Sequence, residues 1–213
     1  MTGLGGTGRL ADDLYLMAHD DRTGRPLLAP RAIGLGLAGA LLAELVLAGH
    51  IEAEVGDIAI ADRSAPQDAL AGVVLGLLVS EPVQHTAREW LAFLARTATG
   101  DLASRLEQAG YLTRAPGRPW RAARWVPADP DCAFAPLARA QAALRPARPP
   151  TAQGVALGGL AVACGLGPRL LSCGPPQARG RLDELTRLLD PSLRELIAQT
   201  QAAVDSAVLA HRV

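Results

Sequence analysis

Apolar residues recur at helical spacing over most of the chain, and short alternating segments interrupt this pattern twice. The first Ala/Leu-rich run ends at Leu45-x-x-Ala48-Gly49-His50-Ile51, after which apolar and polar residues alternate up to Ile60 around a Gly56-Asp57 turn. Glycine readily adopts the left-handed conformation that ends a helix, and alternation around a turn is typical of a β-hairpin. The pattern therefore predicts a helix, a glycine cap and a hairpin.

The same order of elements occurs a second time. The sequence Leu106-x-x-Ala109-Gly110-Tyr111-Leu112 repeats the helix end and its cap, and short strand-like segments then flank a longer turn at residues 115–119. We expect a second helix, cap and hairpin here. Such a unit organises a fold but carries no reactive group.

The remaining periodicity predicts a largely helical chain. Helices are expected over Leu10–Ala18, Ile33–Ala48, Asp68–Val79, Ala87–Ala95, Phe134–Leu144 and Thr151–Leu171, with turns at residues 20–26 and 127–131. Two amphipathic helices follow, the last starting at Asp190-Pro191. We expect a mainly α fold: a single helical globule with peripheral β-hairpins over residues 10–213, preceded by a flexible glycine-rich lead at residues 1–9.

Composition supports a helical core and excludes a strong electrostatic field of the whole molecule. The chain has 213 residues, a size that buries roughly two-thirds or more of its extended surface. It is 49% hydrophobic and only 3% aromatic, which favours helices that pack through small residues. All 21 basic residues are arginine, which is typical of a GC-rich genome, and the formal net charge is +0. Any contact with nucleic acid or an anionic bilayer must therefore use a local patch.

Neither a membrane span nor a metal site is expected. The longest apolar runs fall short of the about 20 residues that a span needs, and the N-terminus lacks the charged and apolar regions of a signal peptide. We expect a cytoplasmic protein. The cysteines Cys132, Cys164 and Cys173 have no C-x-x-C spacing, and the histidines do not cluster with them, so no metal and no cofactor is predicted.

Two patterns resemble catalytic or nucleotide-binding motifs but have simpler explanations. Gly34-x-Gly36-x-x-Gly39 matches the dinucleotide fingerprint by letter, yet no buried strand precedes it, so a glycine-tolerant helix start or close helix packing is predicted instead. Asp12 and Asp13 fall in the first turn of a predicted helix, where negative charge is favourable and capping explains it. No catalytic residue is predicted.

The second predicted hairpin leaves three interpretations open. It combines cationic and aromatic side chains, which together grip phosphates and bases in some proteins; the residues are Arg114, Arg118, Arg121, Arg124, Trp120 and Trp125. The first interpretation is a solvated hairpin face with inward tryptophans. The others are a surface for an anionic ligand and a winged-helix-like surface for DNA, of which nucleic acid is the least favoured.

Several segments in a fixed order resemble one protein family. These are Leu10-Ala11-Asp12-Asp13-Leu14-Tyr15-Leu16-Met17-Ala18, the Asp20-Asp21-x-x-Gly24 turn, Leu37-x-Gly39-x-x-Leu42-x-Glu44-Leu45, Trp90-Leu91, Leu102-x-x-x-Leu106-x-x-x-Gly110-x-Leu112 and Arg187-Leu188-Leu189-Asp190-Pro191. Their order and spacing resemble the Golgi phosphoprotein 3 (Golgi peripheral phosphoprotein) family over nearly the whole chain. The compact length and the arginine-only basic set look like a bacterial, actinobacterial member.

The resemblance implies a non-enzymatic protein that binds membranes peripherally. Eukaryotic relatives bind phosphatidylinositol 4-phosphate, insert a hydrophobic loop and act as adaptors for glycosyltransferase tails. The family's headgroup tryptophan and helix arginine correspond to Ala29 and Ala38 in this sequence, and Arg96 corresponds to an arginine of a later helix. Paired arginine contacts with a phosphorylated headgroup and shallow apolar insertion are two signals that together give stable membrane attachment.

We therefore expect an anionic, phosphoinositide-like lipid headgroup to bind at Arg25, Arg31 and Arg96, with Leu27 and Leu28 as the membrane-insertion residues. Arg25 and Arg31 are predicted because they flank the apolar Pro26-Leu27-Leu28 segment. The expected location is the cytoplasm, with peripheral attachment to the inner face of the cytoplasmic membrane. The alternative function is a cytosolic protein-interaction scaffold without lipid binding, and a protein partner or self-association is compatible with both.

Overall fold

The computed structural model describes residues 7–115, 124–145, 150–172 and 177–210. Within these ranges the chain forms ten helices and two antiparallel hairpins. The helices are α1 (Leu10–Ala18), α2 (Pro30–Leu47), α3 (Ala69–Ser80), α4 (Ala87–Leu94), α5 (Ala98–Gln108), α6 (Pro130–Ala143), α7 (Ala152–Ala163), α8 (Gly167–Leu171), α9 (Ala178–Arg187) and α10 (Pro191–Ala210); the strands are β1 (Ile51–Glu54), β2 (Asp57–Ile60), β3 (Leu112–Ala115) and β4 (Arg124–Pro127). This architecture confirms the predicted mainly α fold with peripheral hairpins.

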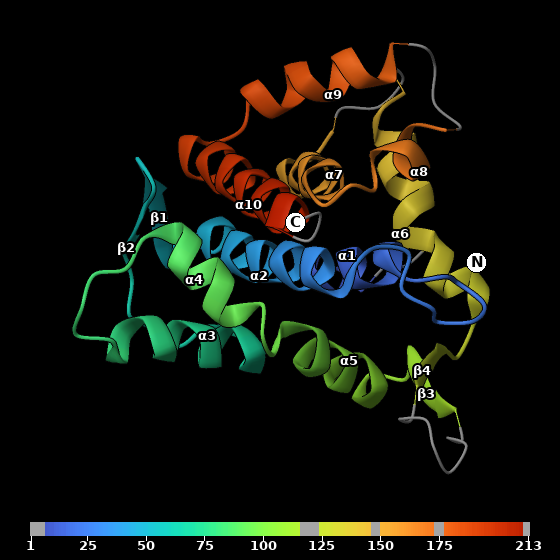
Figure 1. The fold of residues 1–213 in the computed structure, drawn as a ribbon, viewed down its shortest axis with the longest axis horizontal. Helices are drawn as coiled ribbons and strands as arrows, with labels where there is room; N and C mark the ends of the chain where they lie inside the picture. Colours follow the sequence, from blue (N-terminus) through green and yellow to red (C-terminus); the bar gives the residue numbers. More distant parts are fainter. Residues whose placement is uncertain (1–6, 116–123, 146–149, 173–176, 211–213) are drawn as a thin grey trace.

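Helix α2 forms the centre of the molecule. It contacts α1, α7 and α10 on one side and α3, α4 and α5 on the other, so that helices surround it in Figure 1. The hairpin β1–β2 follows α2 at one end of the molecule, and β3–β4 lies at the other end. Thirteen of the 18 residues of α2 are buried, and its exposed residues are Pro30 and Arg31 at the start and Leu47 at the end.

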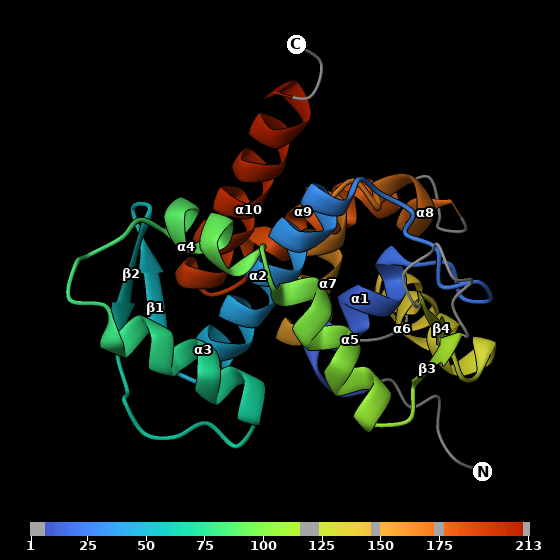
Figure 2. The same cartoon turned by 60° about the horizontal axis from the view of Figure 1, so that its bottom comes forward.

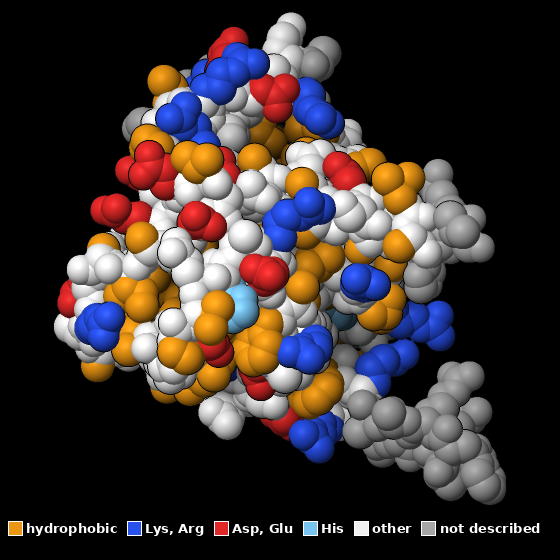
Figure 3. Space-filling view, turned by 60° about the vertical axis from the view of Figure 1, so that its left-hand side comes forward, with side chains coloured by type: hydrophobic (Ala, Val, Ile, Leu, Met, Phe, Trp, Pro, Cys, Tyr) orange, Lys and Arg blue, Asp and Glu red, His pale blue; other side chains and the backbone are white. Residues whose placement is uncertain are grey.

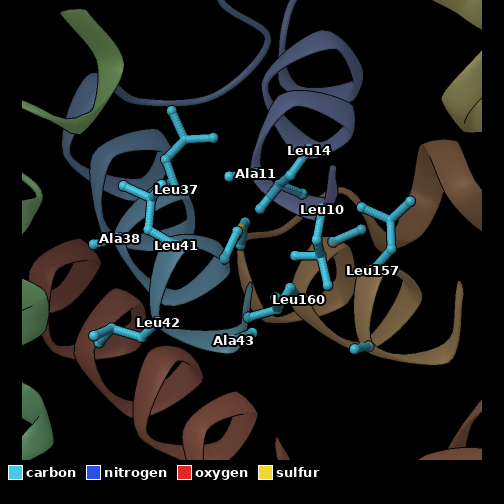
Figure 4. Packing of buried hydrophobic residues seen from close by; sticks show 14 of the residues in the cluster. Leu10, Ala11, Leu14, Leu37, Ala38, Leu41, Leu42, Ala43, Leu157 and Leu160 are labelled. Atoms are coloured by element: carbon cyan, nitrogen blue, oxygen red, sulfur yellow. The ribbon is translucent and has the colours of Figure 1, made fainter. Parts of the chain in front are cut away.

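The core consists mainly of leucine and alanine. Leu37 and Leu41 of α2 meet Leu10 and Leu14 of α1, and Leu160 of α7 completes the contact (Figure 4). Burial of this apolar surface supplies the driving force for folding. One buried apolar cluster extends from α1 to α10.

Three glycines allow the neighbours of α2 to approach closely. A Cβ atom on Gly34 would lie 2.6 Å from the carbonyl oxygen of Ala95, and Cβ atoms on Gly36 and Gly39 would collide with Cys164 and Thr200. The Gly34-x-Gly36-x-x-Gly39 sequence therefore serves helix packing, as predicted, and lies wholly inside a helix.

Both predicted helix caps are present. Gly49 and Gly110 have positive φ values of 76° and 80°, and each directly precedes the turn into a hairpin. In the first hairpin Ile51 pairs with Ile60 and Glu54 with Asp57, so the turn is Val55-Gly56, one residue earlier than the predicted Gly56-Asp57. The repeated sequence phrase thus predicts correctly that a hairpin follows each cap, but it does not give the exact position of the first turn.

Two predicted helices require correction. The single helix expected over Thr151–Leu171 is two helices, α7 and α8, because Gly165 adopts a φ of 100° that a continuing helix cannot accommodate. Helix α6 begins at Pro130, inside the segment predicted as a turn, because the Asp129 side chain accepts a hydrogen bond from the Asp131 N–H at 2.9 Å.

Candidate functional site

The α1–α2 loop, residues 19–29, carries most of the predicted site residues and has a defined shape. Asp20 Oδ1 accepts hydrogen bonds from the backbone N–H and the hydroxyl of Thr23, both at 2.7 Å. The Asp20 N–H donates to the Arg25 carbonyl at 2.8 Å, and the Leu27 N–H donates to the Ala18 carbonyl at 2.9 Å. The predicted turn is therefore present, and it fixes the backbone on either side of Arg25.

The loop rests on the β3–β4 hairpin. Gly24 has a φ of 63°, and a Cβ atom there would lie 3.1 Å from the Val126 Cα and would collide with the Trp125 carbonyl oxygen. No larger side chain fits at this contact without a shift of the backbone. The loop and the hairpin therefore share one end of the molecule.

Arg25 and Arg31 are exposed at this end, as the site prediction requires. No carboxylate among the described residues lies within ion-pair distance of either guanidinium group. Arg31 belongs to the first turn of α2, which contains no acidic residue and which no described side chain caps. The uncapped N–H groups of a helix N-terminus and two unpaired cations together favour an anion.

Leu27 and Leu28 lie in different environments. Leu27 is 40% exposed. Leu28 is half-buried against the core, and its side chain reaches within 3.6 Å of the position that a Cβ atom on Gly165 would occupy. Of the two predicted insertion residues, Leu27 is therefore the one available at the surface, and Leu28 anchors the loop.

Arg96 lies on a segment that packs against the same helix end. It follows Ala95, whose carbonyl contacts Gly34, and Gly34 lies one turn after Arg31 in α2. Its guanidinium group lies 4.8 Å from the centre of the Phe93 ring, and its Nε donates to the Phe93 carbonyl at 3.4 Å. The structure thus places the elements that carry Arg25, Arg31 and Arg96 around the N-terminal end of α2.

Arg169, which sequence reasoning missed, also lies near this loop. Hydrogen bonds from Thr23 are the main cause of a lowered Asp20 pKa, and the positive charge of Arg169 in α8 acts in the same direction. The Arg169 Nε is buried and has no hydrogen-bond partner among the described residues. Only the folding of α8 against the loop brings this arginine close, so no local sequence signal could have found it.

Two of the predicted residues in the β3–β4 hairpin, Arg114 and Trp125, make contacts with Glu107 of α5. Trp125 is half-buried, and its Nε1 donates to Glu107 at 3.1 Å. Arg114 lies 5.1 Å from the Trp125 ring centre and 3.4 Å from a Glu107 carboxylate oxygen. These contacts favour the interpretation of a hairpin packed on α5. Arg118, Arg121 and Trp120 lie outside the described residues.

Asp12 and Asp13 lie in the first turn of α1, as predicted, but their role goes beyond a favourable charge at a helix start. Both side chains are buried, at 3% exposure, and bind arginines of other helices. Asp12 binds Arg105 of α5 at 2.7 Å, and Asp13 binds Arg139 of α6 at 2.6 Å. Burial raises the pKa of both carboxyls, and the arginines oppose that effect.

The described residues offer neither a metal-binding cluster nor an exposed apolar helix of membrane-spanning length. No group of three or more His, Cys, Asp and Glu side chains suited to a metal ion is found among the described residues. One helix in the described part of the chain, Pro30–Leu47, is long and apolar enough to cross a membrane, but 72% of it is buried inside the folded protein. Burial to this extent is typical of the core helix of a folded protein.

These features define a class: a mainly helical protein with a central apolar helix, two peripheral hairpins and an arginine-bearing loop at the N-terminal end of that helix. The family model described as Golgi phosphoprotein 3 (GPP34) matches residues 10–200, and the chain belongs to that family. The resemblance found in the sequence is thereby confirmed. A search of curated proteins found no match.

The two family positions that are alanine here lie in contrasting places. Ala29 is exposed at the start of α2, whereas Ala38 is fully buried in the core (Figure 4). A side chain at position 38 therefore cannot reach solvent in this structure. If this chain binds an anionic headgroup, its cations must come from other positions.

Proposed function

We propose that this protein binds an anionic, phosphoinositide-like lipid headgroup at a membrane surface without catalysing a reaction. The observation that carries the proposal is the position of two exposed arginines, Arg25 and Arg31, on either side of the exposed Leu27 at the N-terminus of α2. Neither arginine has an ion-pair partner in the part of the chain that the structure describes. Family membership supports the same function. The cytoplasmic face of a membrane is the location that fits it.

The chemistry of the loop suits a phosphorylated headgroup. Arginine forms paired hydrogen bonds with phosphate oxygens, and its charge does not depend on pH in the physiological range. Arg96 extends the cationic surface along the α4–α5 junction, and Leu27 adds a shallow apolar contact. Figure 3 shows arginine side chains along its right-hand edge, interspersed with hydrophobic ones.

Vesicle flotation tests the proposal. The wild type is mixed at physiological salt with neutral vesicles, with vesicles that contain phosphatidylserine or cardiolipin, and with vesicles that contain a phosphoinositide. Binding to charged vesicles alone is expected, together with its loss in the Arg25→Glu/Arg31→Glu variant. Absence of flotation with every composition would refute membrane binding.

A matched variant separates a site from a general charge effect. Arg63→Glu/Arg187→Glu makes the same change in net charge at two exposed arginines outside the loop that have no ion-pair partner among the described residues. The proposal requires this variant to float like the wild type. Equal loss in both double variants would show that the loop has no special role.

A protein-interaction scaffold is the second candidate function, and a different surface favours it. Helices α3 and α4 expose Val73 (59%), Phe93 (42%) and, in the segment between them, Val83 (60%). A cavity of about 330 Å³ between the helices is lined by apolar and aromatic side chains together with His85 and two glutamates. Figure 3 shows a histidine among hydrophobic side chains on this face. Monomeric proteins rarely expose large apolar patches without a partner.

A further inference from the structure

Five charged residues from four parts of the fold form a cluster, which we call the Arg105 cluster: Arg9, Asp12, Glu44, Asp68 and Arg105. All of them except Arg9 are largely buried. Arg105 of α5 contacts Asp12 of α1 at 2.7 Å and Asp68 at 2.7 Å. Arg9 contacts the other oxygen of Asp68 at 2.9 Å. Asp68 also caps α3 by accepting from the Ala71 N–H at 2.9 Å. The cluster therefore links α1, α2, α3 and α5.

Glu44 is the carboxylate in this cluster without a close cation. Its side chain is 14% exposed, and the nearest guanidinium nitrogen, Arg105 Nη2, lies 3.9 Å away. It accepts one hydrogen bond, from the Ala11 N–H at 2.8 Å. Burial raises the pKa of Glu44 to about 7, and the neighbouring Asp12 and Asp68 charges add to that rise. The Glu44 charge therefore changes within the range of ordinary solution pH.

The segment Thr7–Arg9, which we call the strap, lies against the Arg105 cluster. The Thr7 N–H and hydroxyl donate to Asp13 Oδ1 at 3.2 and 3.1 Å, and the Gly8 carbonyl accepts from Gln153 of α7 at 3.0 Å. Arg9 provides the ionic contact and is 44% exposed. Gly8 and Arg9 line a cavity of about 590 Å³ whose wall includes Glu44 and Asp68. The strap thus covers part of that cavity.

We propose that the strap is controlled by a proton on Glu44: it is held in place while Glu44 is ionised, and it loosens when Glu44 becomes neutral.

The charge count of the cluster gives the reason. With Glu44 ionised, three carboxylates face Arg105 and Arg9. If Arg9 moved away, the buried Arg105 alone would have to balance three negative charges. With Glu44 neutral, only two carboxylates remain and Arg9 has less charge to balance. Burial makes such an excess costly. Because coupling between two sites is reciprocal, Arg9 also lowers the proton affinity of Glu44 through Asp68 and Asp12.

The other described charged groups near the cluster do not take over the role of Arg9 or of Glu44. Asp13 neighbours Asp12 but is paired with Arg139 of α6 at 2.6 Å. His50 and Asp62 stand on the opposite wall of the cavity and face each other at 3.7 Å. The described cations in contact with the cluster carboxylates are therefore Arg9 and Arg105.

Nuclear magnetic resonance on the labelled full chain tests the proposal between pH 5.5 and 8.5. The carboxyl ¹³C signal of Glu44 reports its titration, and ¹⁵N relaxation reports the order parameters of the Gly8 and Arg9 amides. We expect order parameters of about 0.85 at pH 8.5 and below about 0.6 at pH 5.5, with the midpoint at the Glu44 titration. Strap order that does not follow the Glu44 titration would overturn the proposal.

Three variants sharpen the result. Glu44→Gln keeps the size but removes the charge, so its strap is expected to be loose at every pH; a strap as rigid as that of the wild type at pH 8.5 would contradict the mechanism. Glu54→Gln, at an exposed position of β1, is the matched control and should behave as the wild type does. Arg9→Gln should move the Glu44 midpoint to higher pH, and an unchanged midpoint would also overturn the proposal.

Discussion

The carboxylate of Glu44, in the last turn of α2, accepts a hydrogen bond from the backbone N–H of Ala11 at 2.8 Å and so caps helix α1 from another helix. The N-cap residue of α1 is Arg9, whose side chain makes no capping hydrogen bond. An unsatisfied N–H at a buried helix end is costly. The start of α1 therefore depends on a residue 33 positions further along the chain.

This contact predicts a pH dependence of stability with a defined sign. The folded-state pKa of Glu44, about 7, lies above the ordinary glutamate value of 4.5. Its contribution to the free energy of unfolding is therefore full below pH 4.5 and is lost as pH rises through about 7. Urea unfolding at several pH values should show this decline in the wild type and less of it in Glu44→Gln. Identical pH profiles for the two proteins would contradict the prediction.

The buried ring of His19 predicts the opposite dependence of stability on pH. Its ring is buried, stacks on Tyr15 at 4.2 Å between centroids, and places Nδ1 2.8 Å from the Tyr15 carbonyl oxygen. Burial lowers the His19 pKa below the ordinary histidine value of 6.5, against the opposing effect of that hydrogen bond. The contribution of His19 is therefore present above pH 6.5 and is lost as pH falls. His19→Gln should lose less stability on acidification than the wild type does, as measured by urea unfolding, and equal losses in the two proteins would contradict the prediction.

Loss of Arg105 should be among the most damaging single changes. The Arg105 side chain is 11% exposed and binds Asp12 and Asp68, so Arg105→Ala leaves buried carboxylates without their cation. Removal of one partner of a buried pair costs about 3–5 kcal/mol of unfolding free energy. Arg179→Ala breaks an exposed pair at 3.9 Å, and it should cost about 0–1 kcal/mol in the same denaturation experiment. Similar losses for the two variants would show that burial of the pair is unimportant.

A pair of glycine substitutions tests the packing of α2. Gly39→Ala places a methyl group against Thr200 of α10, with Thr200 Cγ2 at 3.1 Å, and should destabilise the protein by about 1–3 kcal/mol. Gly76→Ala adds the same group in α3, where nothing lies within 4 Å, and should stabilise it by roughly 0.5–1 kcal/mol. Thermal unfolding of both variants measures the contrast, and a shift of the same sign in both would refute it.

Local patterns in the sequence predicted the elements well where local chemistry decides them. Helix α1 has the predicted bounds, and Gly49 and Gly110 end their helices as expected. The prediction failed at Gly165, because an apolar run with several glycines does not reveal which glycine adopts a positive φ. It also failed at the start of α6, where the cap of Asp129 outweighs the turn propensity of the two prolines.

The charged interior could not be predicted from local patterns. Asp12 and Asp13 are neighbours in sequence, but their partners Arg105 and Arg139 lie 93 and 126 positions away. Capping chemistry explains acidic residues in a first helical turn equally well, and only the tertiary packing distinguishes the two cases. Arg169 near the α1–α2 loop is a similar case, since α8 forms only after the break at Gly165.

The central position of α2 affects how the chain reaches its folded state. Synthesis exposes Pro30–Leu47 early, and this segment is apolar enough to attract chaperones or membranes until other helices cover it. Helix α10, one of its main contacts, comes much later in the chain and packs beside it in the folded protein (Figure 2). Full burial of α2 must therefore wait until α10 has been synthesised. During that interval the nascent chain needs protection, although α2 is covered in the folded protein.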